Sequence, residues 1–127
     1  MPQVAWRRSV TPKVIAKKIA ELAQDKKAQD IVVLDMRSSV NFCDYFVICS
    51  GTSDRHVHAI AEGIEEGLAK INQPCNHVQG LRESLWVVFD MGDIITHIFQ
   101  TQSRGFYQLE HLWQDAPIVP WQRKKKS

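Results

Sequence analysis

Long apolar runs are absent from this sequence of 127 residues. Its apolar segments, such as residues 31–34, fall far short of the ~20 residues that a helix needs to cross a bilayer, so a transmembrane protein is excluded. The sequence is not poor in apolar residues either, because 44% of its residues are hydrophobic and 24% are charged. That balance excludes wholesale disorder. The length suits one soluble domain of about 100–150 residues.

Cysteine is scarce. The three cysteines are Cys43, Cys49 and Cys75, an odd number with no CxxC pair. A disulfide framework is therefore not expected, and a reducing compartment is the better prediction. The first ten residues carry two arginines but no apolar signal core. No targeting segment is predicted, and the expected location is the cytoplasm.

A strong excess of one charge is also missing, since 16 basic and 14 acidic residues leave a net charge of +2. All 14 acidic residues lie within residues 11–119, which contain only ten basic ones and so carry a net charge of −4. Nucleic-acid-binding domains usually carry positive charge on the folded surface, so this distribution favours a protein partner, and a basic one. The six remaining basic residues lie outside that region: Arg7, Arg8, Arg123, Lys124, Lys125 and Lys126.

Hydrophobic periodicity predicts an α/β (α+β) fold in which helices pack on a single mixed β-sheet of about five strands, in the order α-β-β-α-β-β-β-α. Thr11 and Pro12 form a typical helix start. The folded domain is expected at residues 11–119, between a flexible segment at 1–10 and a basic, disordered tail at 120–127. We expect helices at about 12–26, 54–71 and 103–113 and strands at 30–36, 44–50, 75–79, 85–90 and 93–100.

The last two predicted strands form a hairpin if Met91-Gly92 is the whole loop. Trp86 would then pair with His97. Because side chains alternate along a strand, one face is typical of a core. This core face carries Leu85, Val87, Phe89, Ile94, Thr96 and Ile98, and the other face carries Trp86, Val88, Asp90, Asp93, Ile95, His97 and Phe99.

The second face mixes large apolar side chains with charged ones. A solvated face would not carry Trp86 and Phe99, and a core face would not carry Asp90, Asp93 and His97. A face that meets another protein carries both kinds, with tryptophan as an anchor and charge at the rim. The alternative is that helices cover this face and the two aspartates only flank a turn, where aspartate is common.

Enzymatic chemistry has weak support. Asp90, Asp93 and His97 could share a proton or bind a metal, but no third carboxylate has matching spacing. His56 and His58 would point in different directions on a helix, so neither a metal site nor catalytic residues are expected. The turn Gly51-Thr52-Ser53-Asp54-Arg55 could hold an anion. The strand after the following helix lacks the acid pair of a nucleotidyltransferase, so we interpret the turn as a helix cap and expect no cofactor.

Four blocks of the sequence, in order, resemble the ribosomal silencing factor family, also called the Iojap or YbeB family. The resemblance covers roughly residues 11–119. The matching blocks are DIVVLD at residues 30–35, DYFVI at 44–48 with GTSDRHV at 51–57, WVVFDMGDIITHIF at 86–99, and YQLEHLW at 107–113 with DAP at 115–117.

The resemblance implies a nucleotidyltransferase-like fold without the catalytic acids, and a protein that is not an enzyme. Members of the family bind the large ribosomal subunit through its fourteenth ribosomal protein. They block joining of the small subunit and repress translation when nutrients are scarce, and they commonly form homodimers. On the matching positions, the resemblance implies a docking surface with Trp86, Asp90, Asp93 and His97, and with Tyr107 and Trp113 nearby.

Some partners and alternatives stay open. Arg123, Lys124, Lys125 and Lys126 are expected to make at most peripheral contacts with rRNA. One alternative is a nucleotide-binding protein or a degenerate nucleotidyltransferase-type enzyme that uses the turn from Gly51 to Arg55. The other is a dimeric scaffold whose hairpin face is the self-interface. No small-molecule substrate and no membrane partner are expected.

Overall fold

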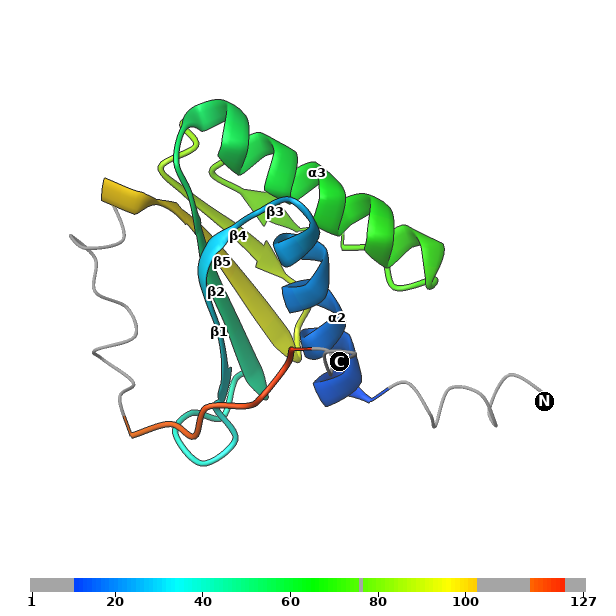
Figure 1. Cartoon of the computed structure of the whole chain (residues 1–127). Helices are drawn as coiled ribbons and strands as arrows, with labels where there is room; N and C mark the ends of the chain where they lie inside the picture. The colour runs from blue at the N-terminus through cyan, green and yellow to red at the C-terminus, as the bar shows by residue number, and fades with distance from the viewer. Residues whose placement is uncertain (1–10, 76, 103–114, 123–127) are drawn as a thin grey trace, which may run out of the picture.

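The computed structural model describes residues 11–75, 77–102 and 115–122. Two helices cover one face of a five-stranded sheet, as Figure 1 shows. The predicted single mixed sheet is confirmed. The predicted helix at 103–113 lies outside the described residues. The elements are α2 (Pro12–Asp25), β1 (Gln29–Asp35), β2 (Tyr45–Gly51), α3 (Asp54–Lys70), β3 (Val78–Gln79), β4 (Trp86–Asp90) and β5 (Ile94–Gln100).

Both helices begin at the caps that the sequence predicts. The Thr11 hydroxyl accepts a hydrogen bond from the Val14 amide at 3.3 Å, and Pro12 opens α2. The Ser53 hydroxyl accepts one from the His56 amide at 3.1 Å and opens α3. These bonds satisfy amides that have no partner inside a helix. Each helix then buries one apolar stripe against the sheet.

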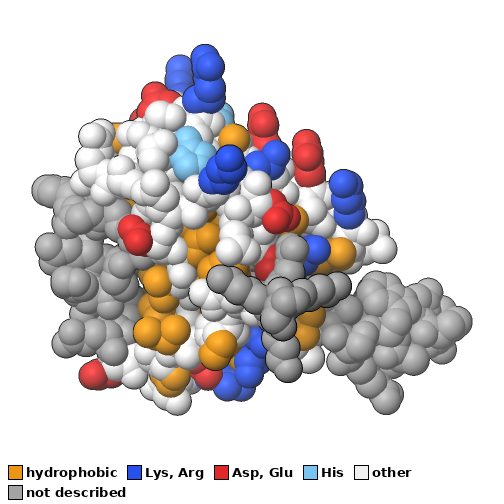
Figure 2. Space-filling view, in the orientation of Figure 1, with side chains coloured by type: hydrophobic (Ala, Val, Ile, Leu, Met, Phe, Trp, Pro, Cys, Tyr) orange, Lys and Arg blue, Asp and Glu red, His pale blue; other side chains and the backbone are white. Residues whose placement is uncertain are grey.

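The strands lie in the order β1-β2-β5-β4-β3. The central pair, β2 and β5, is parallel, and the other three pairs are antiparallel. The helices cover the side chains of one face, which include Val47, Phe89 and Ile98. The opposite face has its own apolar cluster, which includes Phe46 and Phe99. The space-filling view shows charged side chains of both signs over α3, while hydrophobic side chains gather lower in the view (Figure 2).

The hairpin register differs from the predicted one by two residues. Trp86 lies opposite Phe99, not His97, and His97 lies opposite Val88. The Met91 amide donates to the Ile94 carbonyl at 3.0 Å, so the loop is Gly92-Asp93, and Gly92 adopts φ +87°. Glycine adopts this backbone conformation without strain. Because the shift is two residues, the alternation is unchanged and each side chain of the paired strands keeps its predicted face.

Leu85 does not belong to the core face, which corrects the prediction. Its side chain is 43% exposed, whereas Val87 and Phe89 are fully buried. Strand β4 begins only at Trp86, and Ser84 before it has φ 61°. The chain turns at this left-handed residue, so Leu85 falls outside the alternation of the strand.

The segment after residue 114 lies along the outer edge of β1 and covers it, as Figure 1 shows. The Asp35 amide donates to the Pro117 carbonyl and the Val119 amide to the Val33 carbonyl, each at 2.8 Å. Trp121 is 8% exposed, packs in the core, and donates its indole N–H to the Ile31 carbonyl at 3.3 Å. Residues 120–122 are therefore not part of a disordered tail. An indole gains more free energy from burial than its ordering costs.

No described helix is long and apolar enough to cross a bilayer.

Candidate protein-binding face

The face of the hairpin that points away from the helices is the candidate site, and we call it the Trp86 face. Every second residue of β4 and β5 contributes to it, and the predicted mixture of apolar and polar side chains is present. Its members range from fully buried to exposed. They are Trp86, Val88 and Asp90 from β4 and Ile95, His97 and Phe99 from β5.

At the centre of this face Trp86 and His97 form a hydrogen-bonded pair. The indole Nε1–H donates to Nδ1 of His97 at 3.1 Å. The indole also stacks on Phe99, with 5.2 Å between ring centroids, and Phe46 meets the imidazole edge-on at 4.8 Å. The stacking on Phe99 and the hydrogen bond to His97 thus hold the half-buried indole, and Phe46 in turn packs on the imidazole.

His97 is a buried, neutral histidine. Only 6% of it is exposed, and burial lowers its pKa to about 4. Because Nδ1 accepts the indole proton, the ring proton of the neutral form sits on Nε2. Nε2 has no hydrogen-bond partner among the residues that the structure describes. The imidazole therefore orients Trp86 and does not reach solvent as a charged group.

The two predicted aspartates lie at the turn end of the face. The Asp90 carboxylate accepts the Gly92 amide at 2.9 Å, which fixes its orientation. The Asp93 carbonyl accepts the amides of Asp44 at 2.7 Å and Tyr45 at 3.1 Å. Both carboxylates are exposed. Asp90 thus precedes the turn and Asp93 lies in it, and both present negative charge at this end of the Trp86 face.

Burial raises the pKa of the nearby Cys43 thiol to about 11, and the charges of Asp44, Asp90 and Asp93 add to the effect. Negative potential therefore extends from the turn into this end of the sheet. A thiol with such a pKa stays protonated at neutral pH and is a poor nucleophile.

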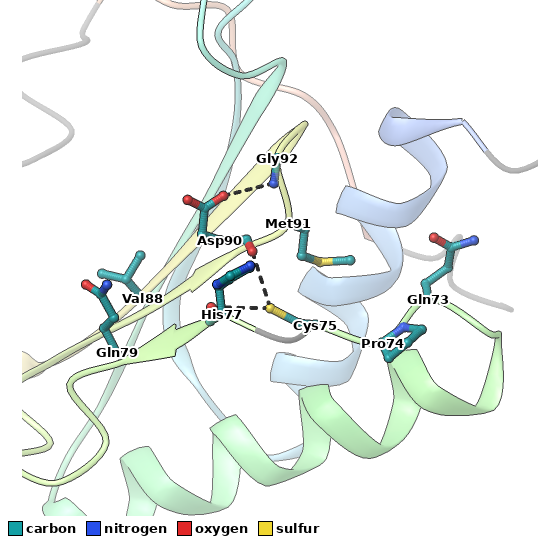
Figure 3. Close-up of a pocket in the computed structure, with 9 residues that line it drawn as sticks. All are labelled: Gln73, Pro74, Cys75, His77, Gln79, Val88, Asp90, Met91 and Gly92. Atoms are coloured by element: carbon teal, nitrogen blue, oxygen red, sulfur yellow. Dashed lines mark hydrogen bonds between the residues drawn. The ribbon is translucent and has the colours of Figure 1, made fainter.

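A pocket of about 630 Å³ opens beside the Asp90 end of the face (Figure 3). The residues that line it come from the α3–β3 connection, β3, β4 and the hairpin turn. The Cys75 thiol donates to the carbonyls of His77 at 3.4 Å and Asp90 at 3.6 Å. No local pattern in the sequence marks this pocket, because its lining comes from two separate stretches, residues 73–79 and 88–92. The lining residues are Gln73, Pro74, Cys75, His77, Gln79, Val88, Asp90, Met91 and Gly92.

The turn from Gly51 to Arg55 uses its polar groups internally. The Thr52 amide donates to Nδ1 of His56 at 2.9 Å, and Nε2 of His56 then donates to the Lys26 carbonyl at 2.8 Å. The Asp54 carboxylate, at the start of α3, accepts the side-chain amide of Gln100. A carboxylate at the helix N-terminus repels phosphate, and bonded amides do not bind it. This geometry disfavours the nucleotide-binding alternative.

His56 and His58 bind different carbonyls, as expected on a helix. His58 Nε2 donates to the Leu81 carbonyl at 2.7 Å, far in the sequence from the partners of His56. Within the described ranges, no group of three His, Cys, Asp or Glu side chains could hold a metal ion.

The structure brings together four of the six predicted docking residues. Trp86 and His97 are in contact, Asp90 follows on the same strand, and Asp93 lies in the turn. Tyr107 and Trp113 lie outside the described residues, as does the run from Arg123 to Lys126. The docking role of all six stays a prediction.

Three comparisons with known proteins bear on identity. The ribosomal silencing factor of Bacillus subtilis is 41% identical over 107 residues, which are 84% of this chain and 91% of that protein. A crystal structure of a protein from Chromobacterium violaceum has a TM-score of 0.80 at 27% identity and covers 83% of this chain and 88% of its own. The mouse "Mitochondrial assembly of ribosomal large subunit protein 1" is 31% identical over 98 residues, 75% of this chain and 43% of that protein.

A model of the family described as "Ribosomal silencing factor during starvation" matches residues 9–127. This match and the bacterial relative confirm the resemblance seen in the four sequence blocks. The chain belongs to the ribosomal silencing factor family.

Proposed function

We propose that this protein binds the large ribosomal subunit through its fourteenth ribosomal protein and sterically blocks joining of the small subunit. It thereby represses translation under nutrient limitation, and it needs no catalytic step to do so. The name of the bacterial relative supports a silencing role, and the name of the mouse relative includes the large subunit.

The observation that carries this proposal is the oriented indole of Trp86 on the same face of β4 as the exposed carboxylate of Asp90. Tryptophans held in well-packed surroundings dominate many interfaces, and charged residues surround them at the rim. The net charge of −4 over residues 11–119 complements a basic ribosomal protein. A face of this kind suits protein docking better than phosphate binding.

The proposal has three further parts. The protein acts in the cytoplasm. It forms a homodimer, and the dimer interface competes with docking if both use the Trp86 face. The run from Arg123 to Lys126 adds peripheral contacts with rRNA phosphates.

Cosedimentation with isolated ribosomal subunits tests the proposal. Wild-type protein is expected to pellet with large subunits but not with small subunits, and large subunits loaded with the protein are expected not to join small ones. Binding to neither subunit would refute the proposal. A modest salt dependence is expected if protein contacts dominate, whereas a steep one indicates rRNA phosphates.

Trp86→Ala tests the face itself. Truncation of a tryptophan anchor often costs 2 kcal/mol or more, so we expect binding to large subunits to weaken by about 30-fold. Val14→Ala is the matched control, because Val14 is 50% exposed on α2, on the helix side of the sheet. Circular dichroism verifies that both variants fold. Wild-type cosedimentation by folded Trp86→Ala contradicts the proposal, and loss of the dimer alone supports the scaffold alternative.

A further inference from the structure

Among the described residues that line the pocket beside the Trp86 face, one side chain has a charge of definite sign, Asp90. None of these lining residues is a lysine or an arginine. Burial raises the pKa of the Cys75 thiol, so this group stays neutral at physiological pH. The pocket therefore offers a single negative charge to whatever enters it.

The Asp90 carboxylate is already oriented before a ligand arrives. Its Oδ1 accepts the Gly92 amide at 2.9 Å, and Figure 3 shows the carboxylate turned toward Gly92. Space is open in front of Gly92, because a Cβ added there would meet no atom within 4 Å. A fixed carboxylate beside open space is well suited to receive a cation, because little ordering cost remains.

The remaining walls suit the alkyl part of a long side chain. Val88, on the same face as Asp90, provides apolar surface, and the side-chain amide of Gln79, which pairs with Val88, adds a polar group. Met91 packs toward the helix side of the sheet. An arginine combines an apolar stem with a planar guanidinium that has five N–H donors. Guanidinium matches a carboxylate in geometry, is weakly hydrated and stays charged at every relevant pH, so arginine fits this lining better than lysine.

We propose that this pocket receives an arginine side chain of the protein that docks on the Trp86 face. The inference rests on the proposed function, since it names a contact within that docking. Val88 and Asp90 belong to both the face and the pocket, so the two surfaces are continuous. Trp86 and Asp90 are four residues apart on β4, which places the arginine roughly 13 Å from the tryptophan contact.

Two other ligand classes fit less well. A phosphate or another anion would meet the Asp90 carboxylate, and the described lining residues include no lysine or arginine to offset that charge. A divalent metal needs several oxygen, nitrogen or sulfur ligands, and the described residues contain no such group of three.

The first test uses the free protein and a small probe. N-acetylarginine amide is titrated into ¹⁵N-labelled protein, with the citrulline counterpart as a neutral probe of nearly equal shape. We expect the arginine probe alone to shift the amide signals of Gln79 and Gly92. Asp90→Asn should abolish the shift, because it removes the charge but keeps an oxygen for the Gly92 amide. Equal shifts with both probes, or an undiminished shift in Asp90→Asn, overturn the inference.

The second test measures binding to large subunits. Asp93→Asn is the matched comparison, because it removes the same charge from the same turn but outside the pocket lining. We expect Asp90→Asn to weaken binding about tenfold, as for loss of a charge-assisted pair, and Asp93→Asn about twofold. Equal losses overturn the inference.

The two tests separate this inference from the proposed function. If wild-type protein does not bind large subunits, the proposed function fails, and the probe titration by itself decides whether the pocket takes a guanidinium. If wild-type protein binds large subunits but the probe does not bind, only the arginine pocket fails.

Discussion

At the scale of single residues, His97 couples the stability of the sheet to pH. Its pKa is about 4 in the folded protein, against 6.5 for an ordinary histidine. The unfolded chain therefore binds more protons between these values. The contribution of neutral His97 to the free energy of unfolding is fully present above pH ~6.5. It is lost as the pH falls from there through the folded-state pKa, by about 3 kcal/mol in total.

His97→Gln isolates this effect, because glutamine offers the Trp86 indole an acceptor but does not titrate. Denaturant unfolding at about pH 7.5 and about pH 4.5 gives the loss of free energy for each protein. We expect wild-type protein to lose 2 kcal/mol or so more than His97→Gln between these conditions. If wild-type protein and His97→Gln lose the same unfolding free energy between the two pH values, His97 is solvated in the folded state.

At the scale of elements, two glycines with the same backbone conformation are expected to respond differently to alanine. Gly80 and Gly92 both have φ +87°. A Cβ at Gly80 would overlap the Trp86 carbonyl oxygen, whereas a Cβ at Gly92 has open space. Gly92→Ala should cost about 1–2 kcal/mol from the backbone alone, and Gly80→Ala about 1–3 kcal/mol more.

Chemical denaturation of both variants measures this difference, and Gly92→Ala is the control for the backbone cost. Because the overlap at Gly80 is with the backbone of β4, a movement there also displaces Trp86. Gly80→Ala is thus expected to weaken binding to large subunits. Equal destabilisation by the two substitutions would show that the backbone near residue 80 can shift at little cost in free energy.

Local signals in the sequence predict most elements, and the failures occur where two local choices are equally acceptable or where a contact is non-local. The caps at Thr11 and Ser53 are visible because a helix start depends on neighbouring residues. The hairpin register is not determined in the same way, since Met91-Gly92 and Gly92-Asp93 are both acceptable two-residue loops. For the site, strand alternation predicts which residues share a face. It does not predict that His97 is buried against Trp86, because that depends on the parallel pairing of β2 with β5.

At the scale of the whole molecule, the C-terminal segment closes the sheet. It forms hydrogen bonds with the backbone of every second residue on the outer edge of β1. The groups bonded are the carbonyls of Ile31 and Val33 and the amide of Asp35. An uncovered edge of this kind pairs readily with other chains. The segment therefore both stabilises the fold and protects it from association along β1.

Trp121 is expected to be the main anchor of that segment. Trp121→Ala removes a buried indole and should cost about 3–5 kcal/mol. Trp121→Phe keeps one aromatic ring, loses the hydrogen bond to Ile31 and part of the packed volume, and should cost about 1–2 kcal/mol. Thermal unfolding measures both losses. Light scattering below the melting temperature should reveal association of Trp121→Ala that grows with protein concentration, since an anchor lost at residue 121 frees the edge of β1. A destabilised Trp121→Ala that stays as dispersed as Trp121→Phe would mean that Pro117 and Val119 protect the edge without the indole.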